Sequence, residues 1–232
     1  MTHLEGVPIQ AVLVAEPSSN EVYIAEKGVC WLKLTTYGKT AHGSMPDLGR
    51  NAILMMMTLL DEFQSLNVPY EVHPLLGHFT RSVNTIKGGV GTNVVPDQCE
   101  VTVDQRTVPG MDHNAIAQQV EELIADLEER IEGFRASVEV INDRVPVATS
   151  PDEPVVQQFY DAVETVVGKR PEPKGVNYYT DAVVFAPQLD LPMIICGPGQ
   201  AGLAHQPNEY VEISKLVESA KIFTLAVAQM LT

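Results

Sequence analysis

The sequence predicts an α/β fold in which an open-sheet domain is interrupted by an inserted ferredoxin-like domain. Residues 8–15, PIQAVLVA, and residues 192–196, PMIIC, are short apolar runs, as in parallel strands that are buried on both faces. Between them the pattern changes to alternating strands and one-sided helices, in the order βαββαβ. We therefore predict one α/β domain from residues 1–26 and 142–232, and a ferredoxin-like domain from residues 27–141.

The inserted domain is predicted from four strands and two helices. The strands are expected at residues 28–37, 79–87, 98–107 and 136–141. The helices are expected at residues 49–66 and 113–131, because apolar side chains recur there at helical spacing. The inward-facing side chains are predicted to be Ile53, Met56, Met57, Leu60 and Phe63 in the first helix, and Ile116, Val120, Leu123, Ile124, Leu127 and Ile131 in the second.

The outer domain resumes after the last of these strands. Residues 153–167 are predicted to form a helix with Val155, Val156, Phe159, Val163 and Val166 inward, and Ile213 to Leu231 a final amphipathic helix. The apolar strand at residues 192–196 lies between them. Alternating helices and strands of this kind are typical of an α/β sheet domain.

Composition narrows the classes of function. The chain has 232 residues, 45% of them hydrophobic, and a formal net charge of −15, which argues against nucleic acid and anionic membranes as partners. No apolar run reaches transmembrane length, and the first residues lack the pattern of a signal peptide. The cysteines, Cys30, Cys99 and Cys196, lie in apolar runs without a CxxC pair, so we expect buried thiols and a cytoplasmic location.

Polar residues gather in a few segments: VAEPSS at 14–19, GKTAHGSMP at 38–46, TNVVPDQCEVTVDQRTVPG at 92–110, YYTDAVVFA at 178–186 and GPGQAGLAHQPNEYV at 197–211. Glu16 ends a predicted parallel strand, where open α/β sheets bind ligands. Taken singly, each signal has an ordinary structural explanation. Glu16 fits a surface carboxylate, His42 a surface histidine, and Arg106 a partner of Asp104.

Taken together, in this order and at these intervals, the segments resemble the acetylornithine deacetylase, succinyl-diaminopimelate desuccinylase and aminoacylase family of zinc metallopeptidases. The resemblance covers nearly the whole chain. It implies hydrolysis of the amide bond of N-acyl amino acids or small peptides. It also implies that residues 27–141 form a homodimer and that the outer residues form part of a catalytic domain with two zinc ions.

The resemblance assigns roles to individual residues. Glu16 and His205 match ligands of the two zinc ions, and both residue types bind zinc in proteins. His42 matches a histidine that stabilises an oxyanion in the active site of the partner subunit, and Asn93 matches a residue that supports it. For the substrate, the matching positions are Arg106 (a carboxylate partner), Gly197, Gly199, and with less support Thr180 and Asp181.

The sequence departs from the family in the rest of the metal site. The family's further ligands and its general base lie upstream of the segment that corresponds to residues 8–19. This sequence has no His-x-Asp, and its Glu-Glu pairs, Glu121-Glu122 and Glu128-Glu129, lie on the predicted solvent face of a helix. Because a catalytic zinc needs three protein ligands and a water, we expect an incomplete site and an inactive isolated chain. We also expect strands left without neighbours to be covered by oligomerisation or rearrangement, or to become partly disordered.

The sequence is compatible with three hypotheses. The chain is a segment of a two-zinc amidohydrolase, or it is a dimerisation module without catalysis, or it is an unrelated acidic α/β protein. An in-frame segment upstream of Met1 that encodes His-x-Asp and Glu-Glu would favour the first reading over the second. A single uninterrupted sheet would favour the third.

Overall fold

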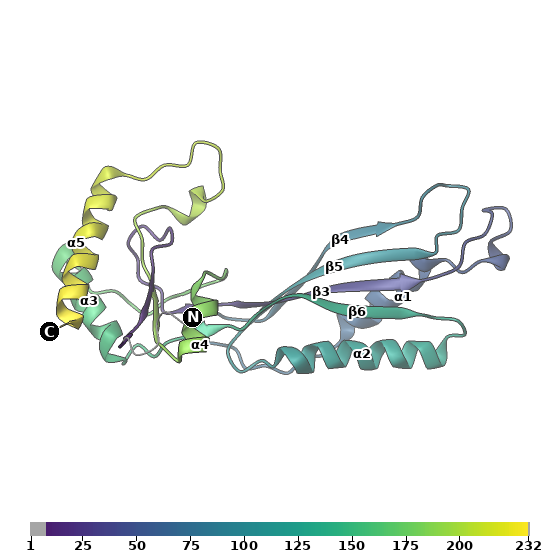
Figure 1. The fold of residues 1–232 in the computed structure, drawn as a ribbon, viewed down its shortest axis with the longest axis horizontal. Helices are drawn as coiled ribbons and strands as arrows, with labels where there is room; N and C mark the ends of the chain where they lie inside the picture. The colour runs from purple at the N-terminus through teal and green to yellow at the C-terminus, as the bar shows by residue number, and fades with distance from the viewer. Residues whose placement is uncertain (1–7, 232) are drawn as a thin grey trace. The chain divides into compact units, whose positions relative to one another are not determined.

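A computed structural model describes residues 8–231, which form two compact units (Figure 1). Of the described residues, unit 1 contains 8–28, 72–77 and 145–231, and unit 2 contains 29–71 and 78–144. Residues 72–77, placed inside the inserted domain by the sequence, therefore belong to unit 1. There Leu75 packs against the hydrophobic core, and a side chain at Gly175 would collide with Leu76.

Unit 2 is the ferredoxin-like fold. Its sheet has the strand order β4-β5-β3-β6, and β4 with β5 and β3 with β6 are antiparallel. Two helices follow the first and third strands, which gives the predicted order βαββαβ. The bounds are β3 Gly28–Tyr37, α1 Ala52–Ser65, β4 Thr80–Gly88, β5 Gln98–Thr107, α2 His113–Arg130 and β6 Ala136–Arg144, with a 3-10 turn at Pro46–Leu48.

The helices of unit 2 bury one stripe each. Asn51 and Asp112 cap α1 and α2, because their side chains accept hydrogen bonds from the first free backbone N–H groups. The buried side chains are Ala52, Met56, Leu59 and Phe63 in α1, and His113, Ile116, Val120, Leu123, Ile124 and Leu127 in α2. Two predicted inward residues are wrong: Met57 is 59% exposed, because it lies about 100° around α1 from Met56, and Ile131 follows the end of α2.

Unit 1 is also mixed α/β. A parallel pair joins β1, Val12–Val14, to β9, Met193–Ile195. A second sheet has the order β7-β2-β8. The other bounds are β2 Ala25–Glu26, β7 Val147–Ala148, α3 Pro154–Val167, β8 Gly175–Val176, α4 Ala182–Leu189, a 3-10 turn at Ala201–Leu203, and α5 Ile213–Met230.

The β1–β9 pair separates two hydrophobic clusters. Ile194 and Leu13 pack into a core with α3 and α5, whereas Met193 and Ile195 pack into a core with α4. Side chains alternate across a strand, so β9 is buried on both faces as predicted. By contrast β1 is only half-buried, since its one strand partner within residues 8–231 is β9.

Two further expectations concern the whole described chain. Cys30, Cys99 and Cys196 are free and buried, as predicted, and burial raises the pKa of Cys30 to about 11 and that of Cys196 to about 12. These thiols are therefore protonated and inert at neutral pH. Within residues 8–231, no helix has the length and hydropathy needed to cross a membrane.

Candidate functional site

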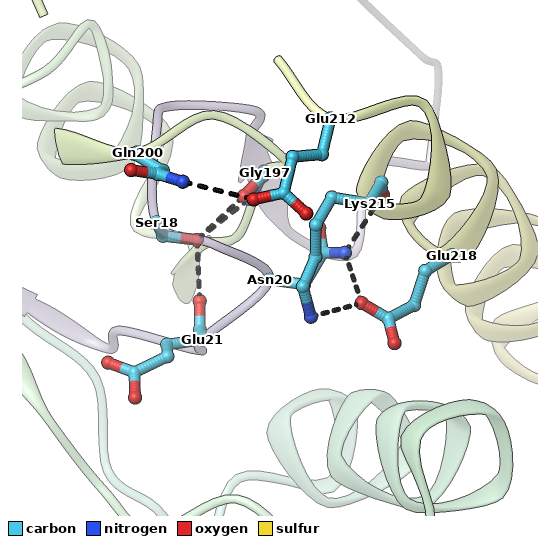
Figure 2. Close-up of polar contacts among 8 residues, drawn as sticks. All are labelled: Ser18, Asn20, Glu21, Gly197, Gln200, Glu212, Lys215 and Glu218. Atoms are coloured by element: carbon cyan, nitrogen blue, oxygen red, sulfur yellow. Dashed lines mark hydrogen bonds and ion pairs between the residues drawn. The ribbon is translucent and has the colours of Figure 1, made fainter. Parts of the chain in front are cut away.

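In unit 1, the loop after β1 is tied to the loop after β9. The hydroxyl of Ser18 donates to the backbone oxygen of Gly197 at 3.1 Å and accepts from the Gly197 backbone N–H at 2.9 Å (Figure 2). The side chain of Asn20 donates to the backbone oxygen of Lys215 at 2.9 Å and to Glu218 at 2.8 Å, which ties the loop to α5. These bonds fix the segment that follows Glu16.

Gly197 has no room for a side chain. A Cβ atom there would lie 2.4 Å from the backbone oxygen of Glu16 and 2.7 Å from that of Ala15. At Gly199 a Cβ would lie 3.0 Å from Pro17. The structure thus gives these glycines a packing reason, the close approach of two loops at adjacent strand ends. Their contact with substrate stays a prediction.

Glu26 is a buried carboxylate that the sequence analysis did not single out. It is fully buried, and its Oε2 accepts a hydrogen bond from the backbone N–H of Thr180 at 2.7 Å. Its Oε1 has no hydrogen-bond partner. Burial raises the pKa of Glu26 to about 7 despite the bonds from Thr180, and the nearby charge of Glu16 raises it further.

Glu16, Glu26 and Tyr178 therefore share one electrostatic environment. Burial raises the pKa of the Tyr178 hydroxyl, and the carboxylates of Glu16 and Glu26 add to that rise. Thr180 is buried, and its hydroxyl accepts from the backbone N–H of Ala182 at the start of α4. The structure thus bonds the predicted residue Thr180 to Glu26, and the charge of the predicted residue Glu16 is near enough to raise the pKa of Glu26. Substrate contact by Thr180 stays a prediction, and Asp181 is exposed beside it.

His205 lies in the exposed loop between the 3-10 turn and α5. Its backbone has a φ of 62°, in the left-handed region, and its N–H donates to Glu209 at 3.3 Å. In the described part of the chain no hydrogen bond or ion pair joins His205 to Glu16. Nor does any group of three or more His, Cys, Asp or Glu residues there have the geometry to hold a metal ion. Zinc ligation by Glu16 and His205 stays a prediction.

In unit 2, the structure brings His42 and Asn93 together. His42 pairs with Val94 in an isolated β-bridge, and the backbone N–H of Gly43 donates to the backbone oxygen of Asn93 at 2.7 Å. A Cβ at Gly43 would lie 3.1 Å from the Asn93 backbone, so a side chain there would press the two loops apart. Both predicted residues are exposed on neighbouring loops, 51 positions apart in the sequence.

The tautomer of His42 follows from its hydrogen bonds. The backbone N–H of Ser44 donates to Nδ1 at 3.2 Å, and the Ser44 hydroxyl lies 2.8 Å from the same atom. Since Nδ1 accepts a hydrogen bond, the neutral ring carries its proton on Nε2. Nε2 is then a donor, which is the type of group that stabilises an oxyanion.

Arg106 is paired with a neighbouring acid, which is the ordinary alternative that the sequence left open. Its Nε and Nη2 donate to Asp104 Oδ2 at 3.1 and 3.0 Å. The side chains are 26% and 23% exposed, so the pair is half-buried on the sheet. Asp104 also accepts from Trp31 Nε1 at 2.8 Å. The pairing fixes the direction of the guanidinium, and binding of a substrate carboxylate stays a prediction.

Fold and candidate site together define a class: a mixed α/β unit interrupted by a ferredoxin-like unit, with polar loops at the strand ends of both. Comparison with known proteins agrees. Residues 24–132 match the family described as the peptidase dimerisation domain. Over 221 residues the chain is 29% identical to an acetylornithine deacetylase of Myxococcus xanthus, covering 93% of this chain and 56% of that protein.

Solved structures show the same fold. The aminopeptidase PepT from Bacillus cereus aligns with a TM-score of 0.79 and 20% identity, over 98% of this chain and 59% of that one. An M20 family metallo-carboxypeptidase from Sulfolobus solfataricus aligns with a TM-score of 0.78 and 16% identity, over 99% and 66%. Residues 24–132 are a peptidase dimerisation domain, and the similarity to the deacetylase over 93% of the chain confirms the resemblance seen in the sequence. The chain spans about half the length of the curated relative.

Proposed function

We propose that this chain is part of a zinc-dependent amidohydrolase that hydrolyses the amide bond of N-acyl amino acids or small peptides. The observation that carries the proposal is the pairing of the His42 and Asn93 loops, which exposes a ring N–H donor beside an amide side chain. The related deacetylase and the peptidases of the same fold are named for amide hydrolysis. In this proposal the His42 Nε2–H and Asn93 stabilise the oxyanion that forms at the attacked carbonyl.

Arg106 has the chemistry for the free carboxylate of such a substrate. A guanidinium has five N–H donors in a rigid plane, and Asp104 holds that plane in one direction. Pairing with Asp104 also lowers the net positive charge at this position. We therefore expect moderate affinity for a carboxylate, with orientation as the main contribution of Arg106.

Glu16 and His205 supply donor types that zinc prefers, a carboxylate oxygen and an imidazole nitrogen. They do not make a complete centre, because residues 8–231 contain no cluster of three metal-binding side chains. The Glu-Glu pairs lie on α2: Glu121, Glu122 and Glu129 are exposed, and Glu128 accepts from the backbone of Ala136.

The proposal therefore predicts that the isolated chain does not hydrolyse amides. The test is an assay of N-acetyl amino acid hydrolysis with added zinc, in which we expect turnover no faster than in a sample without protein. A His205→Ala variant is the control. Robust turnover that disappears in this variant would overturn the prediction, because it would show a complete metal site.

We further propose that the chain forms a homodimer through a surface made by α1 and the edge strand β4. The two elements are neighbours: Arg81 of β4 stacks on Phe63 of α1 at 4.3 Å and donates to its backbone oxygen. The strand order leaves one side of β4 unpaired. The surface also exposes large apolar side chains, namely Leu54 (59%), Met57 (59%), Val83 (37%) and Ile86 (57%).

The opposite edge strand provides a matched control. Leu54→Glu places a charge in the proposed interface, and Val140→Glu places one on β6 at a residue that is 41% exposed. We expect the wild type and Val140→Glu to sediment as dimers and Leu54→Glu as a monomer, because burying an unpaired carboxylate is costly. A wild-type chain that is monomeric at high micromolar concentration would contradict the proposal.

Assembly without catalysis is the second candidate function. It is favoured by the complete ferredoxin-like unit and by the absence of a three-ligand cluster in the described residues. The gene sequence upstream of Met1 separates the two candidates. An in-frame segment with His-x-Asp and Glu-Glu supports the hydrolase, and its absence supports the module.

A further inference from the structure

The face of the unit 2 sheet that α1 and α2 leave open carries a small cavity. In β5, Cys99 and Val101 are buried on the helix side, whereas Thr102, Asp104 and Arg106 are half-buried on the other side. The cavity on this open face has a volume of about 230 Å³. We call it the Trp31 pocket, and its lining residues are Trp31, Asn84, Thr102, Val103, Asp104 and Ile141.

All four strands contribute to the Trp31 pocket, and its walls are held in place. Trp31 Nε1 donates to Asp104 Oδ1 at 2.8 Å, which fixes the plane of the indole. Thr102 is hydrogen-bonded to Thr85 on β4 at 2.6 Å. The pocket therefore offers a rigid aromatic wall and the apolar side chain of Ile141, with polar groups at its rim.

The carboxylate of Asp104 links this pocket to Arg106. Asp104 Oδ1 accepts from the indole at 2.8 Å and also lies 2.9 Å from Arg106 Nε, and Asp104 Oδ2 accepts from the guanidinium at 3.0–3.1 Å. Asp104 and Arg106 are two positions apart on one strand, so their side chains leave the same face. A ligand group held by Arg106 would thus lie next to the Trp31 pocket, within the reach of one amino acid.

We propose that the Trp31 pocket is a specificity subsite that takes the apolar side chain of the residue whose free carboxylate Arg106 binds. This inference rests on the proposed function, since it uses Arg106 as the carboxylate partner. A volume of about 230 Å³ is smaller than pockets for whole drug-sized ligands, roughly 300–1,000 Å³, and fits a single side chain. Asp104 is the positioning residue, because it orients both the indole and the guanidinium.

Trp31 is the only tryptophan of the chain, so its emission reports directly on the pocket. The experiment titrates the full chain with millimolar N-acetylleucine, N-acetylglycine and N-acetylleucine methyl ester, and follows Trp31 fluorescence and the heat of binding. We expect N-acetylleucine to change the emission saturably. N-acetylglycine should bind about tenfold to a hundredfold more weakly, because it leaves the pocket empty.

Two neighbouring residues provide the variant and its control. Ile141→Ala removes part of the pocket wall, whereas Val140 does not line the pocket and is similarly exposed, 41% against 42%. Ile141→Ala should weaken the binding of N-acetylleucine at least several-fold and leave the binding of N-acetylglycine unchanged. Val140→Ala should change the binding of neither ligand. The emission of each unliganded variant shows whether the surroundings of Trp31 are intact.

The outcomes separate this inference from the proposed function. Equal affinities for N-acetylleucine and N-acetylglycine, with weaker binding of the ester, would keep the carboxylate role of Arg106. They would overturn the role of the Trp31 pocket as a subsite. Equal binding of N-acetylleucine and its ester would overturn the role of Arg106 and, with it, this inference. Absence of any saturable response to N-acetylleucine would also overturn the inference.

Discussion

Glu26→Gln tests the most unusual group of unit 1. Glu26 is fully buried, Thr180 is the residue that bonds its Oε2, and its Oε1 has no partner. A glutamine has nearly the same shape as the protonated acid but never ionises. The substitution therefore removes the ionisation of Glu26 while keeping an oxygen that accepts from Thr180.

The raised pKa of Glu26 makes the stability of the folded chain depend on pH. The folded-state pKa of Glu26 is raised from 4.5 to about 7, so the folded chain holds a proton that the unfolded chain releases between these values. The stabilisation is therefore fully present below pH 4.5 and is lost as the pH rises to about 7. One pKa unit corresponds to about 1.4 kcal/mol, so the loss is about 3 kcal/mol.

The assay is urea unfolding at a series of pH values. Far-UV circular dichroism reports on the unfolding of both units, whereas the emission of Trp31 reports on unit 2 alone. An unfolding transition that is seen by circular dichroism and not by Trp31 emission therefore belongs to unit 1. As the pH rises from 4.5 to 8, the free energy of unfolding of unit 1 in Glu26→Gln should increase by about 3 kcal/mol relative to that of the wild type. Glu172→Gln, at an exposed carboxylate of unit 1, should run parallel to the wild type. If Glu26→Gln also runs parallel, the reasoning is refuted.

Two further substitutions test packing. His113→Ala should destabilise unit 2 by about 2 to 3 kcal/mol, because the buried Thr107 hydroxyl loses its hydrogen-bond partner and the bond to Asp143 is lost. An unchanged midpoint of urea unfolding, followed by Trp31 emission, would contradict this. Gly197→Ala should destabilise unit 1 by about 1 to 3 kcal/mol, because its Cβ would meet the Glu16 oxygen at 2.4 Å, whereas Gly202→Ala has nothing within 4 Å. Equal far-UV melting curves for these two variants would contradict the reason given for Gly197.

Periodic segments were predictable from the sequence, and short ones were not. β3 and β5 have the predicted bounds, because ten residues of alternating polarity define a face. β2, β7 and β8 are two residues each, too short for any period, and were missed. α4 was also missed, since its eight residues carry Pro187 and no apolar stripe.

The candidate site was predictable by residue type and not by contact. His42 and Asn93 were both named from the sequence, but only the fold shows that backbone pairing holds their loops together. Glu26 gave one weak signal, a charged residue directly after the apolar segment 22–25. Its partner Thr180 is 154 positions away, so no local pattern could reveal the bond that makes it a buried carboxylate.

Zinc titration of the isolated chain tests the central claim most directly. If Glu16 and His205 are two ligands of an unfinished centre, zinc should bind weakly, well below the affinity of structural zinc sites, since only two protein donors are present. Binding should weaken further in Glu16→Gln and in His205→Ala. Tight binding that neither substitution changes would contradict the claim, because the metal would then be held by other residues.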